Sequence, residues 1–306
     1  MRKQLRRTTP LPRGSACFDS SAYRVPLAIA GALFVILIGS SAPGFAGTVV
    51  LKASSSLVTL EQQWAAAYQG AHPGTKIGAT ASDTPVLFEA LRDRKADVLV
   101  VPRALKFKEA QACEAALGKR PADFKVGVNG VAVYVNADNP VKVLTYAELE
   151  SIFNGKCQNW KEVGGNDAPI QVLSQATNSA AGELFKAEVL NDKEFSASAR
   201  TLADTEIPPV IAKDKNAIGY SRLTQTDGIR ALAIKRAQSS TPAEPSEEAI
   251  ADRTYPISRY IYNYINAASD NAEIKAYMEW VRSDEGQQVV KASGFYPLPS
   301  KLRLNR

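Results

Sequence analysis

A short apolar strand that runs directly into a helix is the feature that most constrains how this chain can fold. In the segment Ile170–Phe185, IQVLSQATNSAAGELF, an apolar run gives way to small polar residues and then to a helix. Asn178 or Ser179 is placed to cap the helix, and Glu183 follows in or near its first turn. A helix start of this kind gathers unpaired backbone N–H groups and the positive end of the helix dipole, which suits an anion or a carbonyl oxygen. An ordinary connection that binds nothing is the alternative interpretation.

The same strand, hydroxyl and helix order appears twice more near the start of the globular part. A strand at Thr48–Ala53 is followed by the serines of Ser54–Ser56, and a weaker strand leads to Ser82 and Thr84 before the next helix. The apolar run Ala96–Pro102 lacks alternation, which is typical of a parallel strand covered on both faces. Strands that alternate with helices predict an α/β fold with mainly parallel sheets. Ligands of such sheets bind beyond the carboxyl ends of the strands.

The chain length and the N-terminal segment set the number of domains and the location. A chain of 306 residues is long enough for two lobes. A basic leader, the apolar run Val25–Gly39 and the small residues of Ser40–Ala46 form the pattern of a secretory signal peptide, with cleavage near Ala46. We therefore expect a periplasmic or secreted protein. A retained membrane anchor is the alternative, because the apolar run is only slightly short for a span.

The positive charge of the chain lies mostly in this leader. The leader holds six of the 37 basic residues and one of the 31 acidic residues, so the remainder carries 31 basic groups against 30 acidic ones. A nucleic-acid partner therefore has no support from charge.

Cysteine and histidine usage bears on disulfides and on catalysis. Cys113 and Cys157 remain after the leader is removed, and an even pair in an oxidising compartment is a candidate disulfide. Two buried free thiols are the alternative. His72 is the only histidine, and no catalytic triad or metal-ligand spacing is apparent. We expect a protein that is not an enzyme and that needs no metal or cofactor.

Several stretches of the chain match a known family, and the run from Gly130 to Gly165 is the longest and most specific. In chain order the matching stretches are ASSSLVTLEQQWAAAY, KADVLVVPRAL, GVAVYVNADNPVKVLTYAELESIFNGKCQNWKEVGG, NAIGYSRL, YPISRYIY and SDEGQQVVKASGFYPL. Over nearly all of residues 47–299 the chain resembles the periplasmic phosphate-binding proteins of ABC transporters, of the type II periplasmic binding protein superfamily.

The resemblance implies two α/β lobes joined by crossing segments, with the ligand in the cleft between them. After a signal peptide at 1–46, one lobe would comprise residues 47–135 and 256–306, and the other residues 136–255. The implied function is a monomeric binding protein that delivers phosphate or a related small oxyanion to an ABC permease. A sensor or accessory protein that binds a less charged ligand is the alternative.

The resemblance also implies where the first lobe would contact the ligand. The family has a hydroxyl residue after the first strand, where this chain has Ser55 and Ser56. It has a serine at the start of the next helix, where Thr84, or Ser82 with a shift of register, can stand in. Arg103 follows the position at which the family often has a hydroxyl or acidic residue.

In the second lobe the family has an arginine shortly before a Ser-Gly-Thr turn. Here the register gives Gln175 in place of the arginine, and only Ser179 of the turn is kept. A buried phosphate needs charge compensation, and glutamine cannot supply the bidentate fork of arginine. The resemblance therefore implies a modified anion site.

Overall fold

The computed structural model describes residues 48–303, which belong to one compact unit of the chain. The expected signal peptide and its cleavage near Ala46 lie outside the described residues. Within residues 48–303 no helix is long and apolar enough to cross a membrane.

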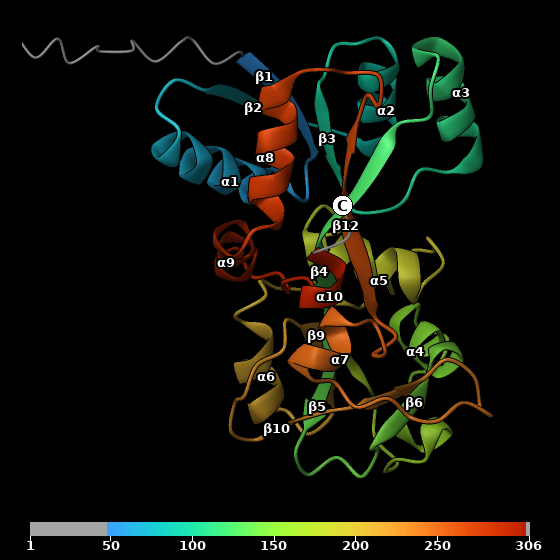
Figure 1. The fold of residues 1–306 in the computed structure, drawn as a ribbon. Helices are drawn as coiled ribbons and strands as arrows, with labels where there is room; N and C mark the ends of the chain where they lie inside the picture. Colours follow the sequence, from blue (N-terminus) through green and yellow to red (C-terminus); the bar gives the residue numbers. More distant parts are fainter. Residues whose placement is uncertain (1–47, 304–306) are drawn as a thin grey trace, which may run out of the picture. The chain divides into compact units, whose positions relative to one another are not determined.

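The first sheet has five strands in the order β2-β1-β3-β12-β4 (Figure 1). β1 runs parallel to β2 and β3, whereas β12 runs antiparallel to β3 and β4. The strands are β1 (Thr48–Ser54), β2 (Lys76–Ser82), β3 (Val98–Val101), β4 (Ala122–Gly130) and β12 (Ser258–Ile265).

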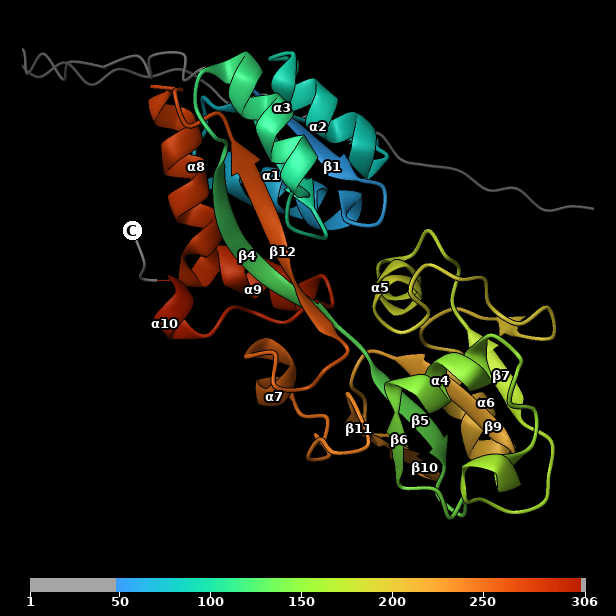
Figure 2. The ribbon, with the colours of Figure 1, turned by 90° about the vertical axis from the view of Figure 1, so that its right-hand side faces the viewer.

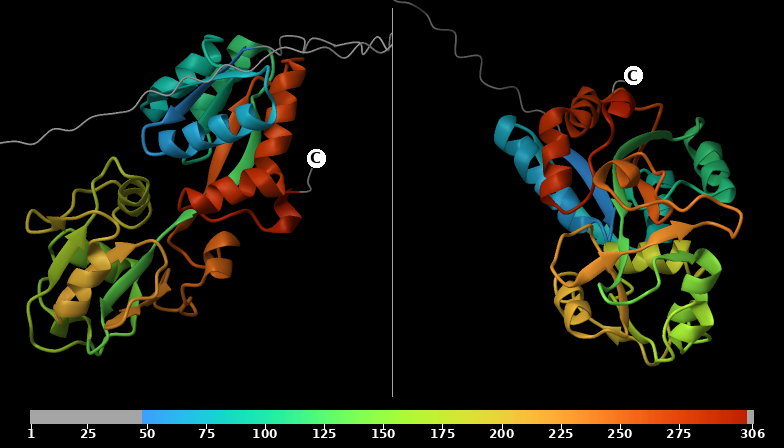
Figure 3. Two further views of the ribbon diagram at one scale, coloured as in Figure 1. Left: turned by 90° about the vertical axis from the view of Figure 1, so that its left-hand side faces the viewer. Right: turned by 90° about the horizontal axis from the view of Figure 1, so that it is seen from below.

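Helices cover both faces of the first sheet. Val98 and Val100 pack with the residues of α1, α8 and α9 on one face, and Figure 3 (left) shows α1 and α8 along it. Leu99 and Val101 pack against α2 and α3 on the other face. The unalternating run in β3 is thus explained by burial on both sides. The helices are α1 (Val58–Ala71), α2 (Thr84–Arg92), α3 (Phe107–Leu117), α8 (Ala272–Arg282) and α9 (Asp284–Ala292).

The second sheet also has five strands, in the order β10-β5-β9-β7-β8, and β6 pairs with β11 beside it. Phe185 stacks on Tyr220 in its core, with ring centroids 3.9 Å apart. The strands are β5 (Ala132–Asn136), β6 (Val143–Thr145), β7 (Gln171–Ser174), β8 (Arg200–Thr201), β9 (Ala217–Ser221), β10 (Ile229–Ala231) and β11 (Ala233–Lys235). The helices of this part are α4 (Tyr146–Phe153), the 3-10 helix η1 (Trp160–Val163), α5 (Ala180–Glu188) and α6 (Ile207–Lys213). Two short helices lie elsewhere: α7 (Glu247–Ala251) contacts β4, and α10 (Ser300–Arg303) bonds to α8 and α9.

The two sheets are mixed rather than mainly parallel, which corrects one part of the predicted fold class. β12 is antiparallel to both of its neighbours, and β5 is antiparallel to β9 and β10. β4 leads straight from the first sheet into β5 of the second, and β12 returns beside β4 in the opposite direction. A two-sheet fold with such crossing strands therefore has antiparallel pairs in both sheets.

The crossing strands set where the chain changes sheets (Figure 2). β4 ends at Gly130, and the strand that begins at Ala132 already pairs within the second sheet. A Cβ atom on Gly130 would lie 2.4 Å from a methyl carbon of Ile250, so glycine permits close packing at this crossing. The strand pairing thus changes sheets slightly before residue 136, and the lobe boundaries themselves stay a prediction.

The expected disulfide is absent from the described residues. Cys113 and Cys157 are free and buried. Cys113 packs between α2 and α3, whereas Cys157 packs in the core of the second sheet beside Trp160. Each thiol fills space in a different core, so the expectation of a bridge near the surface was wrong.

Candidate functional site

Hydroxyl side chains gather at the carboxyl ends of β1 and β2. Ser54, the last residue of β1, is buried, and its Oγ lies 3.2 Å from Ser56 Oγ. Thr84 begins α2 and donates from Oγ1 to Ser54 Oγ at 3.4 Å. Ser54, Ser56 and Thr84 thus form a hydroxyl cluster. Parallel pairing sets Ser82 beside Ser54, and the N–H of the exposed Ser55 donates to the Ser82 carbonyl at 3.3 Å.

The start of α5 is built as the sequence predicted. Ser179 is the N-cap, and its Oγ accepts a hydrogen bond from the Gly182 N–H at 3.0 Å. A Cβ atom on Gly182 would lie 2.1 Å from the Ala176 carbonyl oxygen, so only glycine fits where the loop folds against the helix. Glu183 stands in the first turn, where the helix dipole favours a negative charge.

The hydroxyl cluster and the start of α5 meet through Glu183. Ser56 Oγ donates to Glu183 Oε2 at 2.5 Å. Glu183 Oε1 lies 3.3 Å from Nη2 of Arg259, which is on β12. A carboxylate is therefore held between a hydroxyl from the end of β1 and a guanidinium from a crossing strand.

The crossing strands hold α5 at a second point. Asn129 on β4 is the pairing partner of Arg259 on β12. Its Nδ2 donates to the Ala180 carbonyl oxygen at 2.8 Å. Neighbouring residues of the two crossing strands thus both contact the first turn of α5.

Arg259 is the buried cation of this region, with 7% of its surface exposed. Its Nε has no hydrogen-bond partner among residues 48–303. Burial lowers the pKa of Arg259 below the ordinary arginine value, and the Glu183 carboxylate opposes this shift. A buried guanidinium with an unused donor is costly unless a further partner compensates it.

Arg103 is paired with Glu109, although its charge is near enough to Arg259 to help lower the pKa of that residue. Its two terminal nitrogens each donate to one carboxylate oxygen of Glu109 at 2.7 Å, and its guanidinium lies 5.2 Å from the ring centroid of Phe88. No hydrogen bond or ion pair joins Arg103 to the hydroxyl cluster within the described part of the chain.

Gln175 also turns away from the hydroxyl cluster. Its side chain is buried, and Nε2 donates to Asp204 Oδ1 at 2.9 Å and to the Tyr220 carbonyl oxygen at 3.1 Å. The residue at the expected arginine position therefore serves the packing of the second sheet.

Sequence reasoning missed Arg259 and Asn129. A signal for Arg259 was present, because a charged residue in an apolar strand such as PISRYIYNY is seldom buried without a partner. Asn129 gave no comparable signal, since its role depends on the pairing of β4 with β12.

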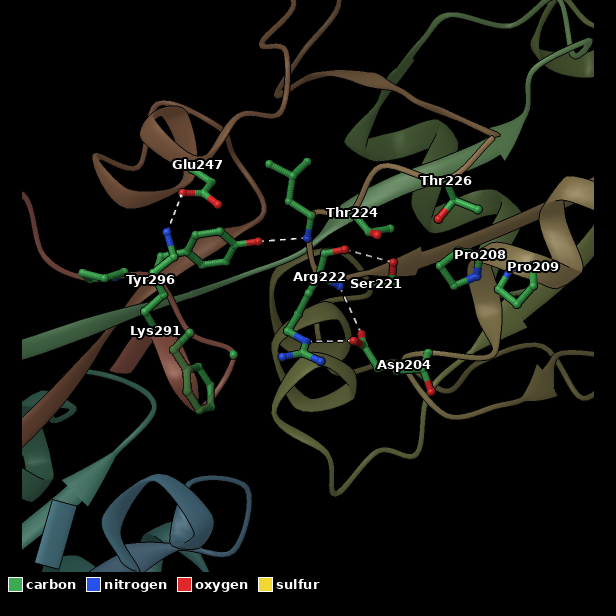
Figure 4. Close-up of a pocket in the computed structure, with 15 residues that line it drawn as sticks. Asp204, Pro208, Pro209, Ser221, Arg222, Thr224, Thr226, Glu247, Lys291 and Tyr296 are labelled. Carbon is green, nitrogen blue, oxygen red and sulfur yellow. Dashed lines mark hydrogen bonds and ion pairs between the residues drawn. The ribbon is translucent and has the colours of Figure 1, made fainter. Parts of the chain in front are cut away.

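A cavity of about 360 Å³ lies apart from the hydroxyl cluster, between the segment that follows β9 and the segment that follows α9 (Figure 4). Arg222 Nε donates to Asp204 Oδ2 at 2.8 Å at its wall, and Tyr296 OH accepts from the Leu223 N–H at 2.9 Å. Lys291 of α9 contributes to the lining, and Figures 1 and 2 show α9 and α5 on opposite sides of the crossing strands. None of the site residues predicted from the sequence lines this cavity.

Comparisons with known proteins agree on one family. Residues 40–285 match the family model described as a PBP superfamily domain. The phosphate-binding protein PstS of Pseudomonas aeruginosa is 28% identical over 279 residues, which cover 85% of this chain and 86% of that protein. PstS of Staphylococcus epidermidis is 29% identical over 252 residues, which cover 79% and 75%.

Solved structures share the fold. A possible phosphate binding protein from Planctomyces limnophilus superposes with a TM-score of 0.75 at 25% identity, over 85% of this chain and 95% of that one. An ABC-type phosphate transport receptor from Vibrio cholerae superposes with a TM-score of 0.68 at 22% identity, over 82% and 100%. Because the family model covers most of the chain and the two-sheet fold is shared, this protein belongs to the PBP superfamily.

Proposed function

We propose that this protein is an extracytoplasmic solute-binding protein that binds phosphate or a related small oxyanion and delivers it to an ABC transporter. The observation that carries the proposal is the hydrogen bond from Ser56 to Glu183, at 2.5 Å. In this bond a hydroxyl at the end of β1 donates to a carboxylate oxygen at the start of α5, which supports an anion position between these two elements. The printed names of the relatives, PstS and phosphate transport receptor, support phosphate as the first candidate.

The hydroxyl cluster and the start of α5 would supply neutral donors and one dipole to the ligand. The hydroxyl cluster supplies O–H groups from the first-sheet side, and the N-terminus of α5, capped by Ser179, supplies backbone N–H groups and a partial positive charge. Ser55 and Ser82 flank this cluster. Gln175 and Arg103 have the weakest support as ligand contacts, because their polar atoms already pair with Asp204 and Glu109.

Donors that come from the two sheet-containing parts of the molecule would give a mechanism for transport. A ligand that contacts both sides stabilises the closed arrangement by the contacts that form only there. A monomeric receptor of this kind would be recognised by its permease in the closed, loaded form.

Isothermal titration of the protein with phosphate, sulfate and molybdate tests the proposal. We expect one binding site per molecule for at least phosphate, and an increase in the melting temperature on adding the bound anion. The Ser198→Ala variant is a control that should bind the anions as the wild type does, because the Ser198 hydroxyl is exposed and pairs with Ser196. Absence of both heat and thermal stabilisation with all three anions would contradict an oxyanion-binding function.

The transport step needs its own test. A membrane extract that contains the cognate permease should retain the protein more strongly when the bound anion is present. Equal retention with and without the anion would contradict delivery to a transporter.

A further inference from the structure

We propose that Arg259 is the positive charge of the binding site and that the Glu183 carboxylate is a built-in competitor, which an anionic ligand must displace. This inference rests on the proposed function and deepens it, because it names the cation of the site and the group that sets its affinity. The two side chains come from elements far apart in the sequence, β12 and α5, and form an ion pair at 3.3 Å.

Arg259 has unused capacity to bind an anion. Its side chain is more than nine-tenths buried, and Nε lacks a hydrogen-bond partner among residues 48–303. The distance of 3.3 Å from Nη2 to Glu183 exceeds the roughly 2.7–2.9 Å of a strong charge-assisted hydrogen bond. The fork of donors is therefore only partly satisfied, and two oxygens of a tetrahedral oxyanion could engage it bidentately.

Glu183 uses the same donors that an oxyanion would need. One of its oxygens accepts from Ser56 Oγ and the other faces Arg259. The helix dipole of α5 stabilises one negative charge at this place, whichever group carries it. A second anion beside the carboxylate would be repelled, so ligand and carboxylate compete.

Glu183 is also able to leave. Its side chain is 32% exposed, so the carboxylate can rotate into water, where hydration offsets the loss of its contacts with Ser56 and Arg259. Arg259 is buried on a paired strand and stays in place. In this ion pair Glu183 is therefore the partner that can move, and Arg259 is the partner that stays fixed.

A purely structural ion pair is the competing explanation. In that case Glu183 would only stabilise the first turn of α5, and its removal would leave anion affinity unchanged or reduced. The two explanations thus predict different effects of the same substitution, since only the competitor role predicts tighter binding.

Phosphate titration of Glu183→Gln against the wild type separates them. We expect the variant to bind phosphate about tenfold more tightly, because a charge-assisted hydrogen bond no longer competes. Glu194→Gln is the matched control, because Glu194 is an exposed acid that pairs with Lys186 of α5. The Glu194→Gln variant should bind phosphate with the affinity of the wild type. Unchanged or weaker binding by Glu183→Gln would overturn the competitor role.

Arg259→Met tests the cation and should weaken phosphate binding about tenfold or more. Arg259→Lys, which keeps the charge but loses the fork, should fall between Arg259→Met and the wild type. Wild-type affinity in a folded Arg259→Met protein would overturn the assignment. Because loss of a buried arginine can prevent folding, Glu183→Gln stands as the independent test.

A double-mutant cycle in thermal unfolding, with no anion added, tests the pairing without ligand. The loss of stability caused by Arg259→Met should differ between the wild type and the Glu183→Gln background, and equal losses would overturn the ion pair as a coupled unit. If the wild type binds phosphate, sulfate or molybdate but Glu183→Gln does not bind more tightly, only this inference fails. If neither protein binds any of the three, the proposed function fails as well.

Discussion

Ser56 and Glu183 lie 127 positions apart in the chain and share a hydrogen bond of 2.5 Å. Ser56 lies two positions after the last residue of β1, in the first sheet, and Glu183 stands in the first turn of α5, which packs on the second sheet. The bond therefore joins the parts of the molecule that contain the two sheets.

Ser56→Ala is expected to weaken binding of phosphate more than Ser55→Ala does. The Ser56 hydroxyl points at the carboxylate position, whereas Ser55 is exposed and its described contact uses only its backbone N–H. Loss of a hydrogen bond to a charged group reduces affinity about ten- to a hundredfold. Titration calorimetry on both variants measures the difference, and an equal or larger loss for Ser55→Ala would contradict this ranking.

Glu61 should make the folded state less stable as the pH rises. It is fully buried on α1, where Tyr277 OH donates to Oε1 at 3.0 Å and Oε2 has no hydrogen-bond partner in the described part of the chain. Burial raises the pKa of Glu61 from 4.5 to about 7, and the bond from Tyr277 only partly opposes this. The folded state therefore binds more protons than the unfolded state between these pH values, so stability falls from about pH 4.5 to about pH 7.

Glu61→Gln should remove this dependence. The shift corresponds to roughly 3 kcal/mol between pH 4.5 and pH 8. Chemical denaturation at pH 5 and pH 8 measures it, with Glu89→Gln on the exposed face of α2 as the control. A Glu61→Gln protein that loses as much stability as the wild type over this range would contradict the assignment.

The two buried cysteines should titrate as thiols in a protein that lacks the leader. Burial raises the pKa of both Cys113 and Cys157, so a thiol reagent should react slowly with the native protein at neutral pH. Without reductant, two thiols should react at once after denaturation, and reductant should leave the melting temperature unchanged. Thiols that appear only after reduction would point to a disulfide instead.

The local parts of the candidate site were predictable from the sequence. Ser54, Ser56 and Thr84 lie together because the parallel strands β1 and β2 end side by side in hydroxyl residues. Ser179 is the N-cap of α5, as its position before the predicted helix indicated. These features depend on short stretches of chain and on the geometry of neighbouring parallel strands.

The long-range parts were not predictable from the sequence. The site contact of Arg259 depends on β12 pairing with β4 and on α5 lying against that pair. The disulfide was wrong because the flanks of Cys113 and Cys157 appear polar in sequence, whereas tertiary packing buries both thiols in different cores. The predicted strand directions were partly wrong, because an apolar run does not show whether the neighbouring strand in the sheet is parallel or antiparallel to it.

Gly182→Ala should damage the start of α5 and the candidate site with it. The new Cβ atom would lie 2.1 Å from the Ala176 carbonyl oxygen, which belongs to backbone and cannot move aside cheaply. The helix or the preceding loop must shift, at a cost of about 1–3 kcal/mol, and the shift would move the backbone N–H groups at the N-terminus of α5 out of position for the ligand. Gly70→Ala is the matched control, because Gly70 lies in α1 with nothing within 4 Å of its Cβ position and alanine favours the helix. Thermal unfolding and phosphate titration should both show a loss for Gly182→Ala alone. Equal behaviour of the two variants would mean that the close packing at Gly182 does not set the position of the α5 N-terminus.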